Sequence, residues 1–357
     1  MTLRKNEGAD LPGDEPESMR PPPPDRISAK REPEADSSPL GQPGAEGKPD
    51  QGQSPLVWIL VLHWQASHYT RACLASLRAL TYPNYRILLL DNGSPDQSGG
   101  SIARHFPEAC LFRLEENLGF AGGCNAGIQY CLERGAEWIW ILNNDTKVGL
   151  DSLDRLISAA QGNPRAAALG AMVMTGAGEQ FVASGPGEID FRRAKTYLRK
   201  EVPGNLPIVD CQWLSGSNLL LRAEAIRQVG GFDEAYFLYF EDTDLCWRLG
   251  QSGWRCLLVP AARVEHVGGG STEGKRTYWR AYYYTRNRLI FFLRYLKGLG
   301  RLPALFFIAG HLVRHTLVLP FRGQSGRYQL KAELLGLSDY LGKRLGKASC
   351  LDWCEPD

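Results

Sequence analysis

Apolar runs of strand length alternate with helix-length segments from Pro55 to Leu142, and no other feature of this chain constrains its fold as strongly. The first run, Leu56 to His63, is almost continuously apolar, and a segment of helix length, Ser67 to Leu80, follows it. A continuous apolar run predicts a strand that is buried on both faces. Such strands alternating with helices predict an α/β fold, with a mostly parallel sheet and helices on both faces. We further expect strands at 85–90, 110–114 and 138–142, and helices after Pro95 and at 120–134.

Polar residues follow three of these predicted strands. Asp91 and Asn92 follow the second strand, Asn117 lies beyond the third, and the segment from Asn143 to Thr146 follows the fourth. In an open parallel sheet, ligands bind beyond the carboxyl ends of the strands. We therefore expect the three strand ends to converge on one crevice.

The second half of the chain is less regular. It predicts a strand near 218–221, a short helix at 224–229, a helix that begins with the acidic segment 241–244, and strands at 255–259 and 264–270. Beyond residue 273, aromatic and basic residues are interleaved. This pattern predicts two helices with an apolar face and a cationic rim.

Composition divides the chain into four parts. Residues 1–53 hold ten of the 22 prolines and almost nothing that could form a core, so we expect a disordered tail, either a solvated extension or a partner-docking tether. A globular domain is expected at 54–272, a basic amphipathic helical region at 273–347 and a short tail at 348–357. Residues 1–50 carry 7 basic and 11 acidic side chains (net −4), whereas residues 273–347 carry 15 and 3 (net +12). This charge asymmetry argues against a nucleic-acid partner. It predicts instead one local basic patch that binds an anionic surface, such as a membrane. Basic helices that merely cover the edge of the sheet would have the same composition.

Cysteine usage and hydropathy favour a cytoplasmic location. The nine cysteines include no CxxC pair, and the first fifty residues contain no apolar run that could act as a signal peptide. The most apolar stretch, 302–320, contains His311, Arg314 and His315, which would be costly at mid-bilayer, so we expect no ordinary membrane span. Together with the basic helices, this predicts a peripheral protein on the inner face of the cytoplasmic membrane.

Two positions could hold a divalent cation. Asn143 and Asp145 lie two residues apart at the end of a predicted strand, where both could present oxygens to one cation, but an Asx turn or a helix cap would use the same residues. His266 ends an apolar strand before the glycine run 268–270, and a lone histidine is more often structural than a ligand.

The acidic segment offers a general base. Glu241, Asp242 and Asp244 exceed what capping a helix requires, although acidic residues in a first turn also complement the helix dipole. Mutual repulsion and an apolar surround would raise the pKa of one of them, as a general base requires. The segment 119–125 lacks GxGxxG spacing and does not follow a strand directly, and the chain contains no GxxxxGK[ST] or GxSxG motif, which argues against dinucleotide binding, P-loop and hydrolase chemistry.

Six motifs occur in a fixed order along residues 55–295. They are DNGS at 91–94, NLGFAGG at 117–123, LNNDT at 142–146, WLSGSNLLLR at 213–222, GGFDEAYFLYFEDTDLCWRL at 230–249 and VEHVGGGS at 264–271. The set closely resembles the family 2 glycosyltransferases, in particular the rhamnosyltransferase-like branch that builds bacterial surface polysaccharides. The resemblance implies a Rossmann-like GT-A fold, a nucleotide-diphospho-sugar donor (dTDP- or UDP-linked), a divalent cation (Mg or Mn), and inverting transfer to a glycan or lipid-linked acceptor.

The resemblance also assigns roles to single residues. Asp145 matches the last acid of the family's DxD-type motif, His266 matches a histidine that joins the metal, and Asp242, beside Glu241, matches the base that deprotonates the acceptor. Trp213, Ser215 and Gly216 are expected on the acceptor side. The implied donor contacts are His63, Trp64, Asp91, Asn92, Asn117, Gly119, Asn125, Asn143 and Asn144.

Two departures from the family pattern affect the donor contacts. The chain has His63, Trp64 and Gln65 where NYN or NWN is usual, and Cys124 where GGNN would place asparagine. Neither touches the implied metal ligands or base. The alternative of a different class is a non-catalytic nucleotide-sugar or carbohydrate-binding module recruited to the membrane.

Overall fold

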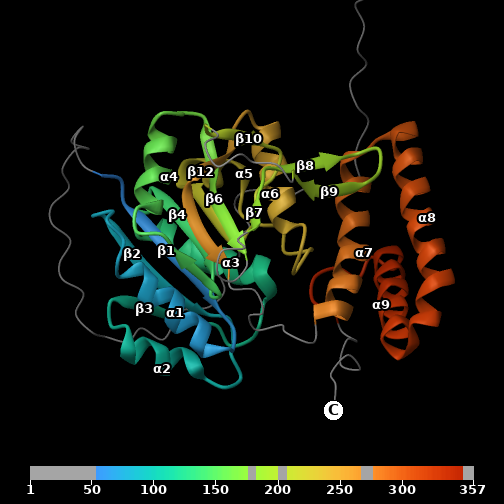
Figure 1. Cartoon of the computed structure of the whole chain (residues 1–357), viewed down its shortest axis with the longest axis horizontal. Coiled ribbons are helices and arrows are strands. Elements are labelled where there is room, and N and C mark those ends of the chain that lie inside the picture. Colours follow the sequence, from blue (N-terminus) through green and yellow to red (C-terminus); the bar gives the residue numbers. More distant parts are fainter. Residues whose placement is uncertain (1–53, 176–181, 200–206, 267–275, 349–357) are drawn as a thin grey trace, which may run out of the picture.

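The computed structural model describes residues 54–175, 182–199, 207–266 and 276–348, and places one large mixed sheet at the centre of the protein (Figure 1). The strand order is β10-β12-β6-β11-β4-β1-β2-β3, with β5 added to β12 and β7 added to β6, and β8 and β9 form a separate hairpin. The strands are β1 (Val57–His63), β2 (Tyr85–Asp91), β3 (Ala109–Arg113), β4 (Trp138–Asn143), β5 (Thr146–Val148), β6 (Ala166–Thr175), β7 (Val182–Ser184), β8 (Gly187–Asp190), β9 (Lys195–Leu198), β10 (Val209–Cys211), β11 (Asn218–Arg222) and β12 (Arg255–His266).

Helices cover both faces of the sheet, as the alternation predicts. Side chains of β1 point alternately to the two faces: Val57, Ile59 and Val61 pack with α1, α2 and α4, whereas Trp58 and Leu60 pack with α3, α5 and α6. The helices are α1 (Ser67–Leu77), α2 (Ser98–His105), α3 (Gly119–Glu133), α4 (Ser152–Gln161), α5 (Ala223–Val229), α6 (Glu241–Gln251), α7 (Arg276–Tyr295), α8 (Arg301–Val318) and α9 (Gly323–Leu341), with short 3₁₀ turns at Gly298–Gly300 and Leu319–Arg322.

The first half of the fold agrees with the prediction, and the second half adds features that it lacks. Strands β1 to β4 pair in parallel, but β11 is antiparallel to both β4 and β6, and β10 is antiparallel to β12. The two strands expected at 255–259 and 264–270 form the single strand β12, which has a register shift between Val259 and Arg263; residues 267–270 lie outside the described part. Helix α4 and strands β5 to β10 were not predicted.

Three α-helices, and not the two expected, lie within residues 276–341, and they stand beside the sheet (Figure 1, orange to red). Helix α7 joins them to the sheet domain: Phe291 and Phe292 are fully buried in an apolar cluster with Tyr236 and Phe240. The predicted tails, 1–53 and nearly all of 348–357, lie outside the described residues.

Helix α8 exposes apolar side chains along much of its length. Leu302 is 58% exposed, Phe306 74% and Leu317 65%. By length and composition alone, one helical stretch in the described part of the chain, Gly298–Leu341, could cross a membrane; its apolar window has a mean hydropathy of 1.5 and is 17% buried. This differs from the expectation that no such stretch occurs, because a few basic and histidine residues do not outweigh many apolar ones in an average.

Candidate active site

The polar strand ends converge on one cavity of about 560 Å³, as predicted from the parallel strands. Strands β1, β4 and β12, the loops after β2 and β3, and the first turn of α6 contribute to its walls. Thirteen of the predicted site residues line it: Trp64, Asn92, Asn117, Gly119, Asn143, Asn144, Asp145, Trp213, Ser215, Gly216, Glu241, Asp242 and His266.

Asp145 and His266 lie side by side in this cavity. Strand β5, which follows Asp145 directly, pairs with the end of β12 so that Thr146 lies opposite His266. The pairing brings His266 Nε2 to 3.2 Å from Asp145 Oδ1, and the Asp145 side chain is only 5% exposed. A carboxylate oxygen beside an imidazole nitrogen is a donor set that fits a divalent cation with further ligands from a bound molecule.

Asp242 is held at the cavity by backbone hydrogen bonds. Its Oδ2 accepts from the Gly216 N–H at 2.9 Å, and its Oδ1 accepts from the Thr243 N–H at 2.7 Å. Burial raises the pKa of Asp242, while these hydrogen bonds favour the charged form and oppose the rise.

Glu241 carries the more strongly perturbed carboxyl. It is 4% exposed, and its Oε2 has no hydrogen-bond partner among the described residues. Burial first, and the neighbouring Asp242 second, raise the pKa of Glu241 well above the ordinary value. Glu241 has a single backbone hydrogen bond that opposes the rise, whereas Asp242 has several, so the negative charge of the pair is better stabilised on Asp242.

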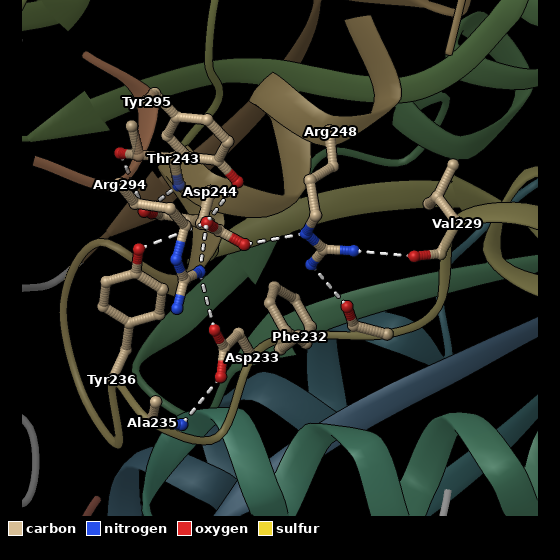
Figure 2. A network of polar contacts seen from close by, with 12 residues as sticks. Val229, Phe232, Asp233, Ala235, Tyr236, Thr243, Asp244, Arg248, Arg294 and Tyr295 are labelled. Carbon is tan, nitrogen blue, oxygen red and sulfur yellow. Dashed lines mark hydrogen bonds and ion pairs between the residues drawn. The ribbon is translucent and has the colours of Figure 1, made fainter. Parts of the chain in front are cut away.

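The third carboxylate of the acidic segment, Asp244, does not line the cavity and belongs instead to a network of polar contacts with Arg248, Arg294 and Tyr295 (Figure 2). It accepts from Arg248 Nε at 2.8 Å, from Arg294 at 3.2 Å and from the Tyr295 hydroxyl at 2.8 Å. Burial would raise its pKa, but Arg248 and Arg294 outweigh burial and lower it. Asp244 therefore links α6 to α7 through its ion pair with Arg294 and its hydrogen bond with Tyr295. Of the three carboxylates in the acidic segment, only Glu241 and Asp242 line the cavity.

The loop before α6 has a strained backbone. Phe237, Tyr239 and Phe240 all have positive φ angles, of 62°, 67° and 73°. Such angles are costly for residues with large side chains and persist only where surrounding contacts hold them. Here the Asn287 amide donates to the carbonyls of residues 236, 238 and 239, so α7 fixes the loop that delivers Glu241 and Asp242.

Asn92 and Asn117 shape the opposite wall. Asn92 Nδ2 donates to the Gly119 carbonyl at 2.9 Å, and its Oδ1 accepts from the Leu118 N–H at 3.1 Å. Gly119 has φ +75°, and a Cβ there would lie 2.5 Å from the Phe237 ring, so the position requires glycine. Asn117 Oδ1 accepts from the Gly119 N–H at 2.8 Å, so both asparagines build the loop at the cavity as well as lining it.

Three predicted donor contacts do not line the cavity. His63 is fully buried and bonds Thr70 Oγ1 at 2.7 Å and Ser98 Oγ at 2.8 Å, and burial lowers its pKa against the opposing charges of Asp91 and Asp96. Asp91 is also fully buried and accepts from the Ser94 N–H. Asn125 donates to the Phe232 carbonyl and to Glu234, so its amide fixes the loop before α6. Short-range sequence order could not separate these inward side chains from their neighbours at the same strand ends.

Comparisons with known proteins agree with the motifs. The family model described as glycosyl transferase family 2 matches residues 58–228. The N-acetylglucosaminyl-diphospho-decaprenol L-rhamnosyltransferase of Mycobacterium tuberculosis (strain CDC 1551 / Oshkosh) is 32% identical over 299 residues, which cover 76% of this chain and 96% of the relative. This chain belongs to glycosyltransferase family 2. The rhamnosyltransferase WbbL of Escherichia coli (strain K12) is 43% identical over 72 residues, 20% of this chain and 26% of the relative.

Solved structures support the GT-A fold of this family 2 glycosyltransferase. GalNAc-T7 with UDP, GalNAc and Mn²⁺ superposes with a TM-score of 0.52 at 15% identity, over 76% of this chain and 59% of that one. The mannosyltransferase PcManGT of Pyrobaculum calidifontis, in complex with GDP-Man and Mn²⁺, gives 0.50 at 13% identity, over 83% and 90%. The predicted fold and family are confirmed, and the chain is a glycosyltransferase.

Helix α7 contributes cavity residues to the glycosyltransferase that the motifs did not predict. Trp279, Arg280 and Tyr284 line the cavity, and Tyr284 packs against Tyr239 and Phe240. The interleaved aromatic and basic residues beyond 273 were the available signal, but an amphipathic helix and a cavity wall share this composition.

Proposed function

We propose that this glycosyltransferase moves a hexose, with rhamnose as the leading candidate, from a dTDP- or UDP-linked donor to a hydroxyl of a lipid-linked or glycan acceptor, with inversion at the anomeric carbon, in bacterial surface polysaccharide synthesis. The carrying observation is that the Asp145–His266 pair and Asp242 come from different elements and line one cavity. The name of the M. tuberculosis relative supports the choice of rhamnose and of an acceptor on a lipid diphosphate.

In this proposal, Asp145 and His266 hold a divalent cation on the donor diphosphate. When bound, the cation supplies Lewis-acid stabilisation of the negative charge on the departing nucleotide. An imidazole ligand favours Mn²⁺ over Mg²⁺, because Mg²⁺ takes oxygen ligands almost exclusively.

Asp242 acts as the general base. It accepts the proton of the acceptor hydroxyl while the new carbon–oxygen bond forms and the bond to the diphosphate oxygen breaks. The raised pKa of Glu241 favours its protonated form, so Asp242 is the carboxylate of the pair that accepts the proton. A single base without a separate nucleophile is consistent with inversion.

The remaining predicted contacts divide along the cavity. Trp64, Asn92, Asn117, Gly119, Asn143 and Asn144 belong to the donor side, and Trp213, Ser215 and Gly216 to the acceptor side. The exposed apolar side chains of α8, next to the basic residues of this region, support peripheral binding to the inner face of the cytoplasmic membrane, where a lipid-linked acceptor is found.

The activity test is release of nucleoside diphosphate from dTDP- and UDP-hexoses with a lipid-diphosphate acceptor and Mn²⁺ or Mg²⁺. The anomeric configuration of the product is read by NMR. Asp145→Ala should abolish turnover, whereas Asp151→Asn, which changes an exposed acid paired with Arg155, should leave it unchanged. Donor binding without turnover across a broad acceptor panel would support the non-catalytic module instead.

Membrane binding is tested by flotation of the full chain with vesicles that contain anionic lipid. Replacing Phe306 and Leu317 by serine should reduce flotation, because both side chains are exposed and apolar. No flotation of the wild-type chain at low salt contradicts the membrane proposal and leaves the transferase proposal untouched.

A further inference from the structure

A second cavity, of about 420 Å³, lies between α7, α8 and α9. Arg280, Tyr284 and Arg288 of α7 line one side, and His311, His315 and Glu333 line the other. Arg280 and Tyr284 also line the active-site cavity, so the helix wall between the two cavities is shared. The His311, His315 and Glu333 cluster plays no part in the proposed transfer reaction.

The three side chains of this cluster converge on one point. One ligand atom from each lies within 4.8 Å of the others. His315 Nδ1 is 2.8 and 2.9 Å from the two Glu333 oxygens, and the centroids of the His311 and His315 rings are 4.0 Å apart. Residues four apart on a helix face the same way, and two histidines at this spacing are a recurrent zinc-binding arrangement.

The chemistry of the cluster suits a borderline divalent ion. Two imidazoles and one carboxylate are the ligands that Zn²⁺ takes in sites with an open fourth position. Glu333 is 3% exposed, and a buried carboxylate needs a cationic partner.

Two guanidinium groups lie near the cluster. Arg314 Nη2 is 3.3 Å from His315 Nε2, so ligation by that nitrogen requires the Arg314 side chain to move away. The Arg288 guanidinium donates to the carbonyls of Ala194 and Arg193, which lie in the turn between β8 and β9. Gln329 supports Glu333 from one helical turn away, with Nε2 3.2 Å from Oε1. The carboxylate is therefore oriented by a second residue, as metal ligands commonly are.

Helix α8 buries few side chains against the rest of the protein. Ala304 and Ile308 are its only buried residues within the described chain, and most of its large apolar side chains face solvent. We infer that His311, His315 and Glu333 form a second metal site, for Zn²⁺ or a similar divalent ion, which clamps α8 to α9 beside the active-site wall.

The test is metal binding by the full-length chain after removal of metal with a chelator. Co²⁺ is used as the probe, because a tetrahedral site with imidazole ligands gives strong visible absorption, and Zn²⁺ binding is measured by calorimetry. We expect His311→Ala to weaken one Zn²⁺ site by more than about 100-fold, since even outer partners of a ligand cost about 10 to 100-fold. Asp145→Ala should retain that site, and His105→Ala, which changes an exposed histidine at the end of α2, should retain it as well.

Thermal unfolding supplies a second readout. Zn²⁺ should raise the Tm of the wild type and of Asp145→Ala, but not of His311→Ala or Glu333→Gln, and the metal-free variants should keep the wild-type circular dichroism. Tetrahedral Co²⁺ spectra and Zn²⁺ stoichiometry that are unchanged in His311→Ala and Glu333→Gln overturn the inference. So does the absence of Zn²⁺ binding by Asp145→Ala, which would make the cluster a His–Glu ion pair only.

Discussion

Replacing Asp242 by asparagine tests the proposed base most directly. The side chain keeps its size, but it loses the ability to accept a proton. General-base assistance is worth about 10² to 10⁴ in rate, which corresponds to about 2.7 to 5.4 kcal/mol in the activation barrier. We therefore expect kcat/KM for nucleoside diphosphate release to fall by at least about 100-fold.

The structure also predicts what Asp242→Asn does to stability. The carboxylate accepts from the Gly216 and Thr243 N–H groups with different oxygens, whereas asparagine has one oxygen and one NH₂ group. One backbone N–H would face another donor, and an unmet buried group costs about 1 to 3 kcal/mol. Relief of the burial of a charge offsets part of this cost, so a modest fall in Tm should accompany a large fall in activity.

The pH profile separates a base from a structural residue. Burial raises the pKa of Asp242, so the acid limb of kcat/KM should lie above the ordinary value of 3.8 for aspartate, with activity rising as the base loses its proton. The limb should persist in Glu241→Gln and disappear in Asp242→Asn. If Asp242→Asn stays within threefold of the wild type and keeps its acid limb, the assignment of the base is wrong.

The other predictions concern the cation, the buried acid and the donor loop. Asp145→Ala should remove the dependence of donor affinity on Mn²⁺, measured by calorimetry with and without the metal, and equal affinities for the wild type and the variant with Mn²⁺ present would contradict the ligand role. The folded-state pKa of Glu241 is raised, so its contribution to stability is fully present below its ordinary pKa of 4.5 and is lost as the pH rises through the folded value. The Tm of Glu241→Gln should therefore increase relative to that of the wild type between pH 4 and 7. A Tm difference that stays constant over this range would argue against a raised pKa. Gly119→Ala should destabilise by at least about 2 kcal/mol in urea unfolding, because its Cβ meets the Phe237 ring as well as requiring a positive φ, whereas Gly135→Ala, with φ +76° and open space, should cost only the smaller backbone strain, and equal effects would show that the ring contact is unimportant.

The local pattern of apolar residues correctly predicted the helices and strands whose sequences are regular over short stretches of the chain. Strands β1 to β4 and helices α1 and α3 each have a continuous apolar run or a helix-length segment, and their observed bounds lie within three residues of the expected ones. Helix α2 was expected only as a short helix after Pro95, and it begins at Ser98. Strand β6 was missed because Ala166–Thr175 is rich in small residues, which carry little strand signal. Strands β8 to β10 were missed because they are only three or four residues long.

The candidate site was predicted in outline from the same strand ends. Residues such as Asn92, Asn143 and Asp145 follow buried strands, so a parallel sheet must place them at one edge. The same reasoning could not distinguish them from Asp91, Asn125 and His63, whose side chains turn into the interior and bond other protein groups. Whether a side chain at a strand end points into the interior or into the cavity depends on loops from other parts of the chain.

Sequence alone determined the α/β class, the family and the residue types available for catalysis, because these depend on short-range periodicity and on motifs read in order. Tertiary structure alone decided which of those residues meet. The pairing of β5 with β12 brings His266 to Asp145, and the arginines of α6 and α7 draw Asp244 away from Glu241 and Asp242. Such pairings join residues that are far apart in the chain, and their free energy comes from burial and hydrogen bonds that no local window contains.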